Sequence, residues 1–175
     1  MNIPPAVAVA IITILASLLL MGGEAILSSF NERQLRSRGA IEPEGDVIDA
    51  MRFAYPGAFL AMGIEGALTG PAPATLLLAG LALFGIAKAL KIWAISSLGG
   101  RWSYRVLILP GVPLVTTGPY RFIPHPNYVA VAGEIVSVAM IVWAPVTGTL
   151  SAVGFGWLMI QRMKIEDRAL GRSTK

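Results

Sequence analysis

The densest set of reactive side chains lies in residues 118–128, which read Gly-Pro-Tyr-Arg-Phe-Ile-Pro-His-Pro-Asn-Tyr. His125, the only histidine of the chain, stands there beside two tyrosines and an arginine. These groups can exchange protons with a ligand or bind it. Three prolines restrict the backbone and Gly118 permits a turn. This rigidity suits a binding site, although a proline-stiffened surface loop would have the same composition.

Two further groups could carry chemistry. Near the C-terminus, Arg162 and Glu166 are four residues apart, so they share a helix face and could pair; Asp167 follows directly. An ordinary amphipathic helix end would show the same pattern. Glu134 lies inside an apolar stretch, where an ionisable group is expensive and indicates function. Glu24 and Glu65 have the same property but lie nearer to the ends of their apolar segments.

The composition indicates that these groups are positioned by a membrane domain. Of 175 residues, 55% are hydrophobic and 14% are charged, whereas soluble domains carry about 25% charged residues. A chain of this length cannot bury so much apolar surface in its own core. The absence of cysteine excludes disulfides, zinc–thiolate sites and thiol nucleophiles, and no metal site is predicted. The net charge of +4 could indicate nucleic-acid binding, but its placement argues against that.

The hydropathy pattern predicts an all-α integral membrane protein in which residues 1–175 form a single domain. Five apolar runs, at 4–30, 53–69, 74–97, 128–144 and 149–163, are expected to be transmembrane helices. The last two are short and separated by a tight turn, so they should form a helical hairpin. Residues 98–127 lack a clean helical pattern and are expected to form a cytoplasmic loop.

The basic residues agree with five spans and an N-terminus outside the cell. With this topology all 14 lysines and arginines fall on the inner face, provided that Lys88 and Lys91 snorkel to the interface. The expected location is a bacterial inner membrane, with the C-terminus and the site on the cytoplasmic side. Contact with anionic membrane lipids alone would also explain most of these charges.

Three blocks of sequence together resemble the isoprenylcysteine carboxyl methyltransferase family. They are residues 118–121 (Gly-Pro-Tyr-Arg), residues 125–128 (His-Pro-Asn-Tyr) and the C-terminal pattern Arg162-x-x-x-Glu166-Asp167-x-x-Leu170. Residues 98–102 look like the segment that precedes the family's core. Glu24, Ser28 and residues 31–33 and 38–42 are similar to a short bacterial branch, associated with O-methylation of lipophilic products such as alkylpyrones.

The resemblance implies a membrane enzyme that transfers a methyl group from S-adenosylmethionine to an oxygen of a lipophilic or prenylated acceptor. The loop 98–127 would cover the cofactor, which would lie between this loop and the terminal hairpin. Glu166 would accept from its hydroxyl or amino groups and Arg162 would bind its carboxylate. Aromatic faces would meet adenine or the sulfonium. The residues expected to bind the cofactor are Tyr120, His125, Pro126, Tyr128, Arg162 and Glu166.

One departure from the family concerns the acceptor. Pro124 stands where members usually have an arginine implicated in handling the substrate carboxylate. Arg121 is the candidate to replace it. A carboxylate or acidic enol needs no base, whereas a neutral hydroxyl would need one, and Glu134 or His125 could serve. Arg121 and Glu134 are therefore the predicted catalytic residues, and the identity of the acceptor stays open, as does the oligomeric state.

Other classes of protein are compatible with parts of the pattern. A small proton-coupled transporter could use Glu24 or Glu65, but it would leave the 98–128 segment and the Arg162/Glu166 pair without a role. A membrane subunit without activity is a second alternative. A reductase that uses NADPH is a third, because membrane sterol reductases share a stretch similar to His-Pro-Asn-Tyr.

Overall fold

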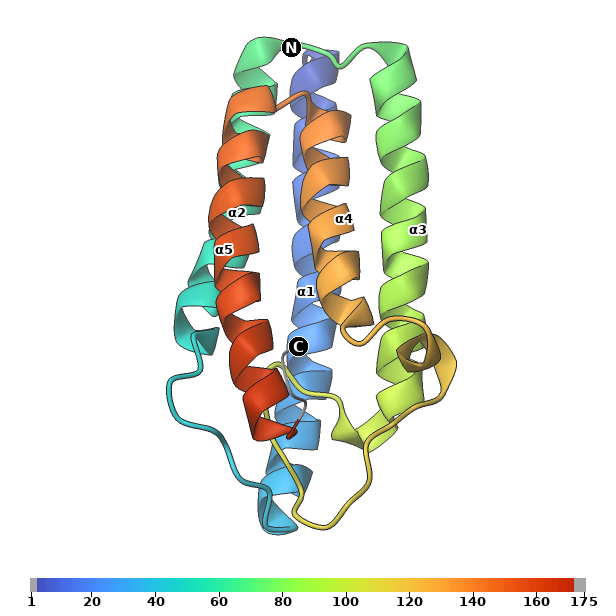
Figure 1. Cartoon of the computed structure of the whole chain (residues 1–175). Helices are drawn as coiled ribbons and strands as arrows, with labels where there is room; N and C mark the ends of the chain where they lie inside the picture. The colour runs from blue at the N-terminus through green and yellow to red at the C-terminus, as the bar shows by residue number, and fades with distance from the viewer. Residues whose placement is uncertain (1–2, 172–175) are drawn as a thin grey trace.

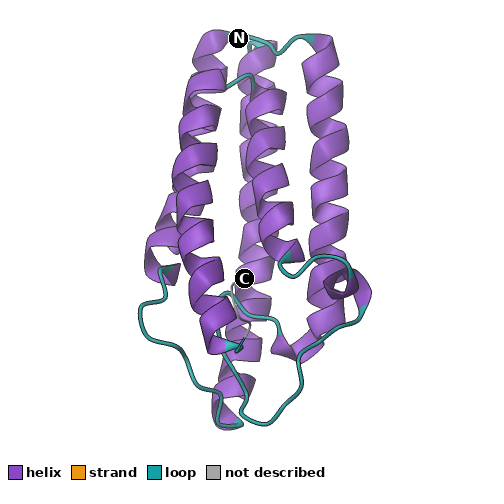
Figure 2. Cartoon of the chain, viewed as in Figure 1, coloured by secondary structure: helices purple, strands orange, loops and turns teal. Residues whose placement is uncertain are grey.

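The computed structural model describes residues 3–171 and shows five long helices packed side by side (Figure 1). They are α1 (Pro5–Ser37), α2 (Ile48–Thr69), α3 (Ala74–Leu98), α4 (Pro126–Val142) and α5 (Pro145–Ala169). Two short 3₁₀ turns, η1 (Gly99–Arg101) and η2 (Gly118–Arg121), lie between α3 and α4. The described part of the chain contains no strand, only one isolated antiparallel bridge between Ile41 and Ile108 (Figure 2).

Four of the five helices are longer than the apolar runs from which they were predicted, and α4 has the same length but begins two residues earlier. Helix α1 continues past residue 30 to Ser37, and α5 begins at Pro145 and continues to Ala169. Proline occupies the first turn of α1, α4 and α5, where its missing N–H has no cost and its fixed φ favours the helix. The polar helix ends extend beyond the apolar segments and carry side chains into the long loops.

The two ends of the bundle differ. Short connections at residues 70–73 and 143–144 join helices at one end, which we call the turn end (Figure 1). At the other, the loop end, the connections 38–47 and 99–125 gather around the last turns of α5. Helices α4 and α5 form a hairpin, and the left-handed conformation of Trp143 (φ 55°) ends α4. The loop end is therefore where distant polar segments meet.

Small residues allow close packing around α4, which contacts α3 most extensively. A Cβ at Gly66 would lie 2.2 Å from the carbonyl oxygen of Val142, and one at Gly80 would lie 3.0 Å from that of Ser137. Small residues at such crossings are typical of helices that associate in membranes, since the backbones can approach closely.

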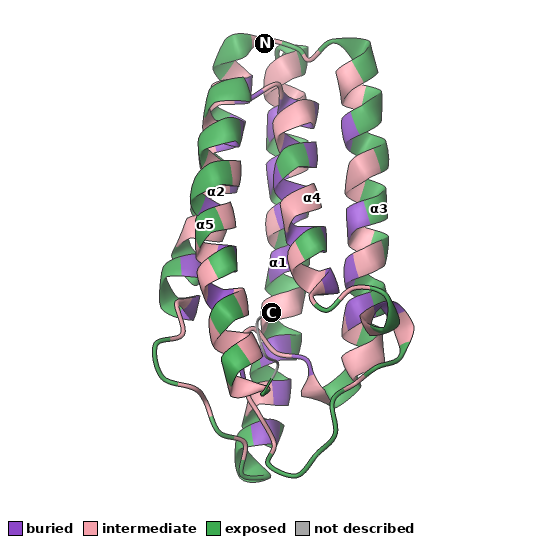
Figure 3. Ribbon diagram, in the orientation of Figure 1, coloured by how far each residue is buried: buried purple, intermediate pink, exposed green. Residues whose placement is uncertain are grey.

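Much of the outer surface of the helices is exposed (Figure 3), and many large apolar side chains are among the exposed residues. Leu19, Leu68, Leu78 and Leu150, from four different helices, are each more than half exposed. Two helical segments in residues 3–171, Pro5–Ser37 and Ala74–Arg101, are long and apolar enough to cross a membrane, and Pro126–Val142 is a shorter apolar helix. An apolar surface this extensive is stable in lipid and would aggregate in water.

Candidate active site at the loop end

A cavity opens at the loop end, between the 98–128 segment and helix α5. Its empty space is about 1100 Å³, a volume that includes the open solvent at its mouth. Helix α5 contributes Arg162 and Glu166, and Leu35 of α1 reaches the same space. All six residues predicted to bind a cofactor line this cavity: Tyr120, His125, Pro126, Tyr128, Arg162 and Glu166.

His125 and Tyr128 at the start of α4 converge on the carboxylates of α5. The Nδ1 of His125 lies 3.6 Å from Oε2 of Glu166, and its Nε2 lies 3.0 Å from Oδ1 of Asp167. The Tyr128 hydroxyl donates to Glu166 Oε2 at 3.0 Å. The hairpin between α4 and α5 thus brings together side chains from two separate blocks of the sequence.

The surrounding charges favour the protonated form of His125 and the ionised form of Glu166. Burial alone would lower the pKa of His125, but the hydrogen bond and negative charge of Glu166, together with Asp167, outweigh burial and raise it above its usual 6.5. Burial alone would raise the pKa of Glu166, yet His125, the Tyr128 hydroxyl and Arg162 hold it below 4.5. A negative carboxylate therefore borders the cavity at neutral pH.

Arg162 does not take Glu166 as its ion-pair partner, as its spacing had suggested. Its Nε lies 3.2 Å from Oδ1 of Asp46, in the loop between α1 and α2, and its guanidinium donates to the carbonyl of Tyr104. The Asp46 and Arg162 side chains are both nearly buried. Asp46 also accepts from the backbone N–H groups of Ile48 and Val106. Arg162 is thus held from two directions at the cavity wall.

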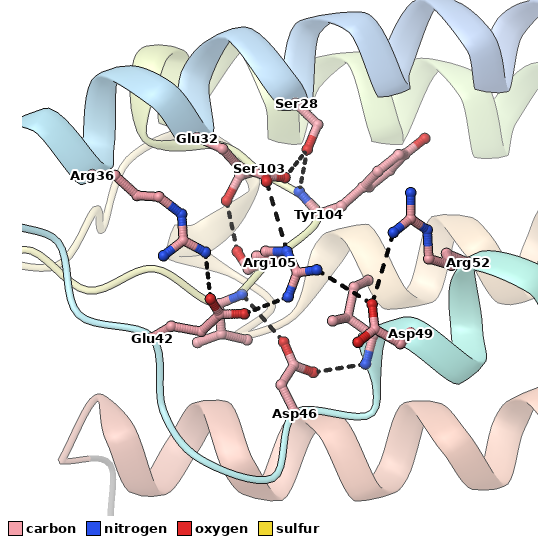
Figure 4. A network of polar contacts seen from close by, with 12 residues as sticks. Ser28, Glu32, Arg36, Glu42, Asp46, Asp49, Arg52, Ser103, Tyr104 and Arg105 are labelled. Carbon is pink, nitrogen blue, oxygen red and sulfur yellow. Dashed lines mark hydrogen bonds and ion pairs between the residues drawn. The ribbon is translucent and has the colours of Figure 1, made fainter.

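An ion network fixes the 38–49 segment against the cavity wall (Figure 4). Arg105 binds Glu42 at 2.7 Å and Asp49 at 3.2 Å, and Glu42 also binds Arg36. Although burial opposes it, the two arginines lower the pKa of the Glu42 carboxyl. The hydrogen bond that Arg105 donates to Glu42 raises the pKa of the Arg105 guanidinium. The N-terminal third of the chain therefore shapes a cavity that the sequence motifs place in the C-terminal half.

Helix α1 also holds the cavity wall directly. The buried Ser28 hydroxyl accepts from the backbone N–H of Tyr104 at 2.8 Å and donates to Glu32 at 2.6 Å. The buried Asn31 amide donates to the carbonyl of Trp102 at 2.8 Å. Tyr104, Arg105, Asp46 and Asn127 were not singled out from the sequence. The acidic residues concentrated in 42–49 were the one available signal, and they do not name their partners.

The two predicted catalytic residues lie away from the cavity lining. Arg121 is exposed on η2, where its guanidinium lies 5.8 Å from the ring centre of Phe122. Its assignment to the acceptor stays a prediction. Glu134 is 1% exposed, in the interior of the bundle, and accepts a hydrogen bond from the Tyr55 hydroxyl.

Glu134 belongs to a buried cluster of four charges that joins three helices. Lys91 of α3 lies 2.6 Å from Glu24 of α1 and 3.3 Å from Glu134 of α4. Lys88 lies 3.1 Å from each of the same two carboxylates. The expectation that Lys88 and Lys91 snorkel to the interface is therefore wrong. Lys91 is 2% exposed, because partner carboxylates on neighbouring helices hold it inside the bundle.

Glu65 has a structural partner as well. Its carboxylate accepts from the backbone N–H groups of Val146 and Thr147 and from the Thr147 hydroxyl, at 3.0, 2.7 and 2.5 Å. The two backbone N–H groups belong to the first turn of α5, where such donors have no partner within the helix. Glu65 of α2 thus caps α5 at the turn end and lies far from the cavity along the bundle.

Comparison with known proteins agrees with the motifs of the loop-end cavity. The sequence profile of the isoprenylcysteine carboxyl methyltransferase (ICMT) family matches residues 79–172, which include most of the cavity lining. The uncharacterized protein YpbQ of Bacillus subtilis (strain 168) is 32% identical over 150 residues, covering 84% of this chain and 88% of YpbQ. No solved structure matches significantly. The chain belongs to the isoprenylcysteine carboxyl methyltransferase family, a family of membrane-bound methyltransferases.

Proposed function

We propose that this protein transfers a methyl group from S-adenosylmethionine to an oxygen atom of a lipophilic acceptor. The observation that carries the proposal is the convergence of His125, Tyr128 and Glu166 in one cavity at the loop end. These residues come from two of the three motif blocks. Small-molecule sites are typically concave and carry a few convergent polar groups, and these three residues converge in such a cavity.

The donors and acceptors of the cavity fit the proposed cofactor. Glu166 presents a carboxylate that can accept from ribose hydroxyls or an ammonium group while it holds Tyr128. Asn127 lines the cavity, and its buried Oδ1 has no hydrogen-bond partner among residues 3–171, so it can accept a hydrogen bond from a ligand. The rings of Tyr120, His125 and Tyr128 supply aromatic faces for adenine or for a sulfonium charge.

The start of α4 supplies a partial positive charge that complements the negative charge of Glu166. No side chain caps its first turn, whose free N–H groups and helix dipole favour an anion such as the cofactor carboxylate. Arg162, held by Asp46 and the Tyr104 carbonyl, adds a guanidinium to the same wall. The site thus offers both a carboxylate for positive groups and donors for a negative one.

When bound, S-adenosylmethionine supplies a methyl group on a positively charged sulfur. The residues of the cavity hold the reactants in line and exclude water, and such alignment can supply about 7–11 kcal/mol of a barrier. A carboxylate or acidic enol acceptor arrives as an anion, for which Arg121 is the predicted partner. A neutral hydroxyl needs a group that takes its proton, and of the two predicted candidates, His125 lines the cavity whereas Glu134 is buried in the bundle.

We infer that all five helices span the bilayer, with the loop end in the cytoplasm. The short turn-end connections, the exposed apolar faces and the absence of basic residues from residues 70–73 and 143–144 support this topology. The water-soluble cofactor would enter from the cytoplasm, and the acceptor would arrive from the membrane, where its tail already lies. No finding supports the alternative of a proton-coupled transporter. Glu24 binds two lysines and Glu65 caps a helix.

Calorimetric titration of S-adenosylhomocysteine into the detergent-purified protein tests the proposal. We expect one site with micromolar affinity that Glu166→Gln weakens at least tenfold, because the amide loses the charge that attracts positive ligand groups. Glu44→Gln is the matched control, since Glu44 is exposed and does not line the cavity. Absence of binding to the wild-type protein, or equal losses in both variants, would contradict a cofactor site at Glu166.

A further inference from the structure

The short turn η2 has one side toward the loop-end cavity and another on the outside of the protein. Tyr120 of η2 and Pro124 just after it line the cavity. Arg121 and Phe122, which stand between them in the sequence, do not line it and are exposed, Phe122 to 72%. Cofactor binding does not explain an exposed phenylalanine beside an exposed arginine. Aromatic and basic side chains do gather where a membrane meets the cytoplasm.

Helix α3 fixes the position of η2. The two elements are in contact, and η2 lies beside the last turns of α3 in Figure 1. A Cβ at Gly118 would lie 2.0 Å from Oγ of Ser97 and 3.2 Å from Nε1 of Trp93, and Gly118 has a φ of 60°. Both the close approach and the left-handed backbone require glycine here. The turn η2 therefore lies at the level of Trp93 and Ser97 along α3.

The length of α3 gives the depth of that level. Helix α3 begins at the turn end with Ala74 and belongs to a segment long and apolar enough to cross a membrane. Trp93 lies about 28 Å from Ala74 at ~1.5 Å per residue, and the hydrocarbon core of a bilayer is ~30 Å thick. Trp93 is 48% exposed, as is typical of a tryptophan at the edge of the hydrocarbon. This places η2 among the lipid headgroups.

Other parts of the loop end project further into water. Helix α1 also begins at the turn end, and its 33 residues extend over about 50 Å, so its last ~20 Å lie beyond the hydrocarbon core. Ile41 follows the end of this helix and is 62% exposed. Ile41 and Phe122 are thus two large apolar side chains of similar exposure at different expected depths.

The charge around η2 is complementary to an anionic leaflet. Residues 99–125 contain three arginines and no acidic residue. Arg105 is paired with carboxylates of another loop, and Arg101 donates to a backbone carbonyl. Arg121 forms no ion pair with a carboxylate in the described part of the chain, and its guanidinium lies beside the Phe122 ring. Its charge is therefore available to lipid phosphates, which attract basic side chains near the surface.

We propose that η2 docks on the anionic headgroups of the cytoplasmic leaflet, with the Phe122 ring at the edge of the acyl chains and the Arg121 guanidinium on lipid phosphates. The inference rests on the topology proposed above. Because Tyr120 and Pro124 belong to the same short segment, the membrane surface holds this rim of the cavity. A lipophilic anion carries its head at the same depth, so the predicted contact of Arg121 with an anionic acceptor would occur there.

Spin labels measure the depth of η2 directly. The chain has no cysteine, so Phe122→Cys, Ile41→Cys and Ile86→Cys each give one labelled position. Ile86 lies in the middle of α3 and is 67% exposed, so its label is the reference for the hydrocarbon core. Collision rates with oxygen and with a water-soluble nickel chelate are measured in nanodiscs that contain phosphatidylglycerol. We expect an oxygen-to-nickel ratio at position 122 at least threefold that at position 41 and below that at position 86.

The three positions separate the docking of η2 from the topology on which it rests. Equal ratios at positions 122 and 41, with a higher ratio at position 86, would overturn the docking and leave the topology standing. Equal ratios at all three positions would contradict the topology itself. Neither result depends on S-adenosylhomocysteine binding, so the methyltransferase proposal is tested separately.

A pair of arginine variants tests the contribution of lipid charge. The label at position 122 is compared in nanodiscs of phosphatidylcholine alone and of phosphatidylcholine with phosphatidylglycerol. We expect the anionic lipid to raise the oxygen-to-nickel ratio at least twofold, and Arg121→Gln to abolish this rise. Arg38→Gln is the matched control, because it removes an exposed charge just after α1 and should retain the rise. A rise that persists in Arg121→Gln, or is lost equally in both variants, would overturn the contact between Arg121 and lipid.

Discussion

Arg162 of α5 lies with its Nε 3.2 Å from Oδ1 of Asp46, although 116 positions separate the two residues in the chain. Asp46 belongs to the loop between α1 and α2, outside the segment that matches the family profile. The ion pair therefore ties the N-terminal part of the protein to the cavity. It also keeps the guanidinium of Arg162 at the wall where a cofactor carboxylate is expected.

Asp46→Asn should weaken both folding and cofactor binding. The change keeps the shape of the side chain but removes the ion-pair partner of Arg162 in a nearly buried position. Breaking a buried pair in this way costs about 3 kcal/mol or more. Thermal unfolding in detergent and S-adenosylhomocysteine titration measure the two effects. Asp49→Asn, whose side chain is 71% exposed, is the control and should change stability far less. Equal effects would show that the Asp46–Arg162 pair has no special role.

Tyr128→Phe should weaken S-adenosylhomocysteine binding by about ten- to a hundredfold. The variant removes the hydroxyl that donates to Glu166 at 3.0 Å, and a hydrogen bond to a charged group contributes about 1.5–3 kcal/mol. Calorimetry of the purified variant gives the affinity. Tyr55→Phe removes a comparable hydroxyl far from the cavity and should bind normally. Unchanged affinity in Tyr128→Phe would show that the Tyr128–Glu166 hydrogen bond does not contribute to cofactor binding.

The sequence predicted the members of the cavity better than their partners. His125, Tyr128 and Glu166 belong to short local motifs, so their residue types and spacing were enough to single them out. The partner of Arg162 was not predictable in this way, because Asp46 lies in a loop whose pairing depends on the packing of α1, α2 and α5. Local helix spacing favoured Glu166 as the partner of Arg162, and the tertiary contact with Asp46 overrode it.

The burial of Lys91 also depends on tertiary contacts that the sequence of a single helix does not predict. The apolar runs predicted the helices in the correct order, since hydropathy depends on each segment alone, but α1, α2 and α5 extend beyond their runs by four or more residues. Lys91 was expected at the membrane surface because a single helix offers it no counter-charge. Glu24 and Glu134, on two other helices, provide that counter-charge inside the bundle.

The stability of the protein should depend on pH through His125 and Glu166. The pKa of His125 is raised in the folded protein, so its contribution is complete below 6.5 and is lost as the pH rises through the folded value. The pKa of Glu166 is lowered, so its contribution is complete above 4.5 and is lost as the pH falls through the folded value.

Both contributions are therefore complete between pH 4.5 and 6.5. Unfolding temperatures measured from pH 4 to 9 should be highest in this window and decline on the alkaline side. His125→Gln should remove the decline that begins above pH 6.5. An identical alkaline decline in wild type and variant would assign it to other groups.

Glu65→Gln should destabilise the hairpin without affecting the cavity. Its carboxylate accepts from the first-turn N–H groups of α5, and loss of such a cap costs about 0.5–2 kcal/mol. We expect a lower unfolding temperature and unchanged S-adenosylhomocysteine affinity. If the wild-type protein in vesicles showed proton-coupled cation flux and Glu65→Gln abolished that flux, the result would support a transporter and contradict the structural role of Glu65.

Transfer of labelled methyl groups tests the central claim most directly. Lipophilic compounds extracted from membranes of the source organism are incubated with the protein in nanodiscs and with tritiated S-adenosylmethionine. The account predicts that radioactivity appears in an organic-soluble product. The radioactivity of this product should fall at least a hundredfold with Glu166→Gln and should be unchanged with Glu44→Gln. Label that stays in the aqueous phase with every extract and every acceptor class supplied, or transfer that Glu166→Gln leaves unchanged, would contradict it.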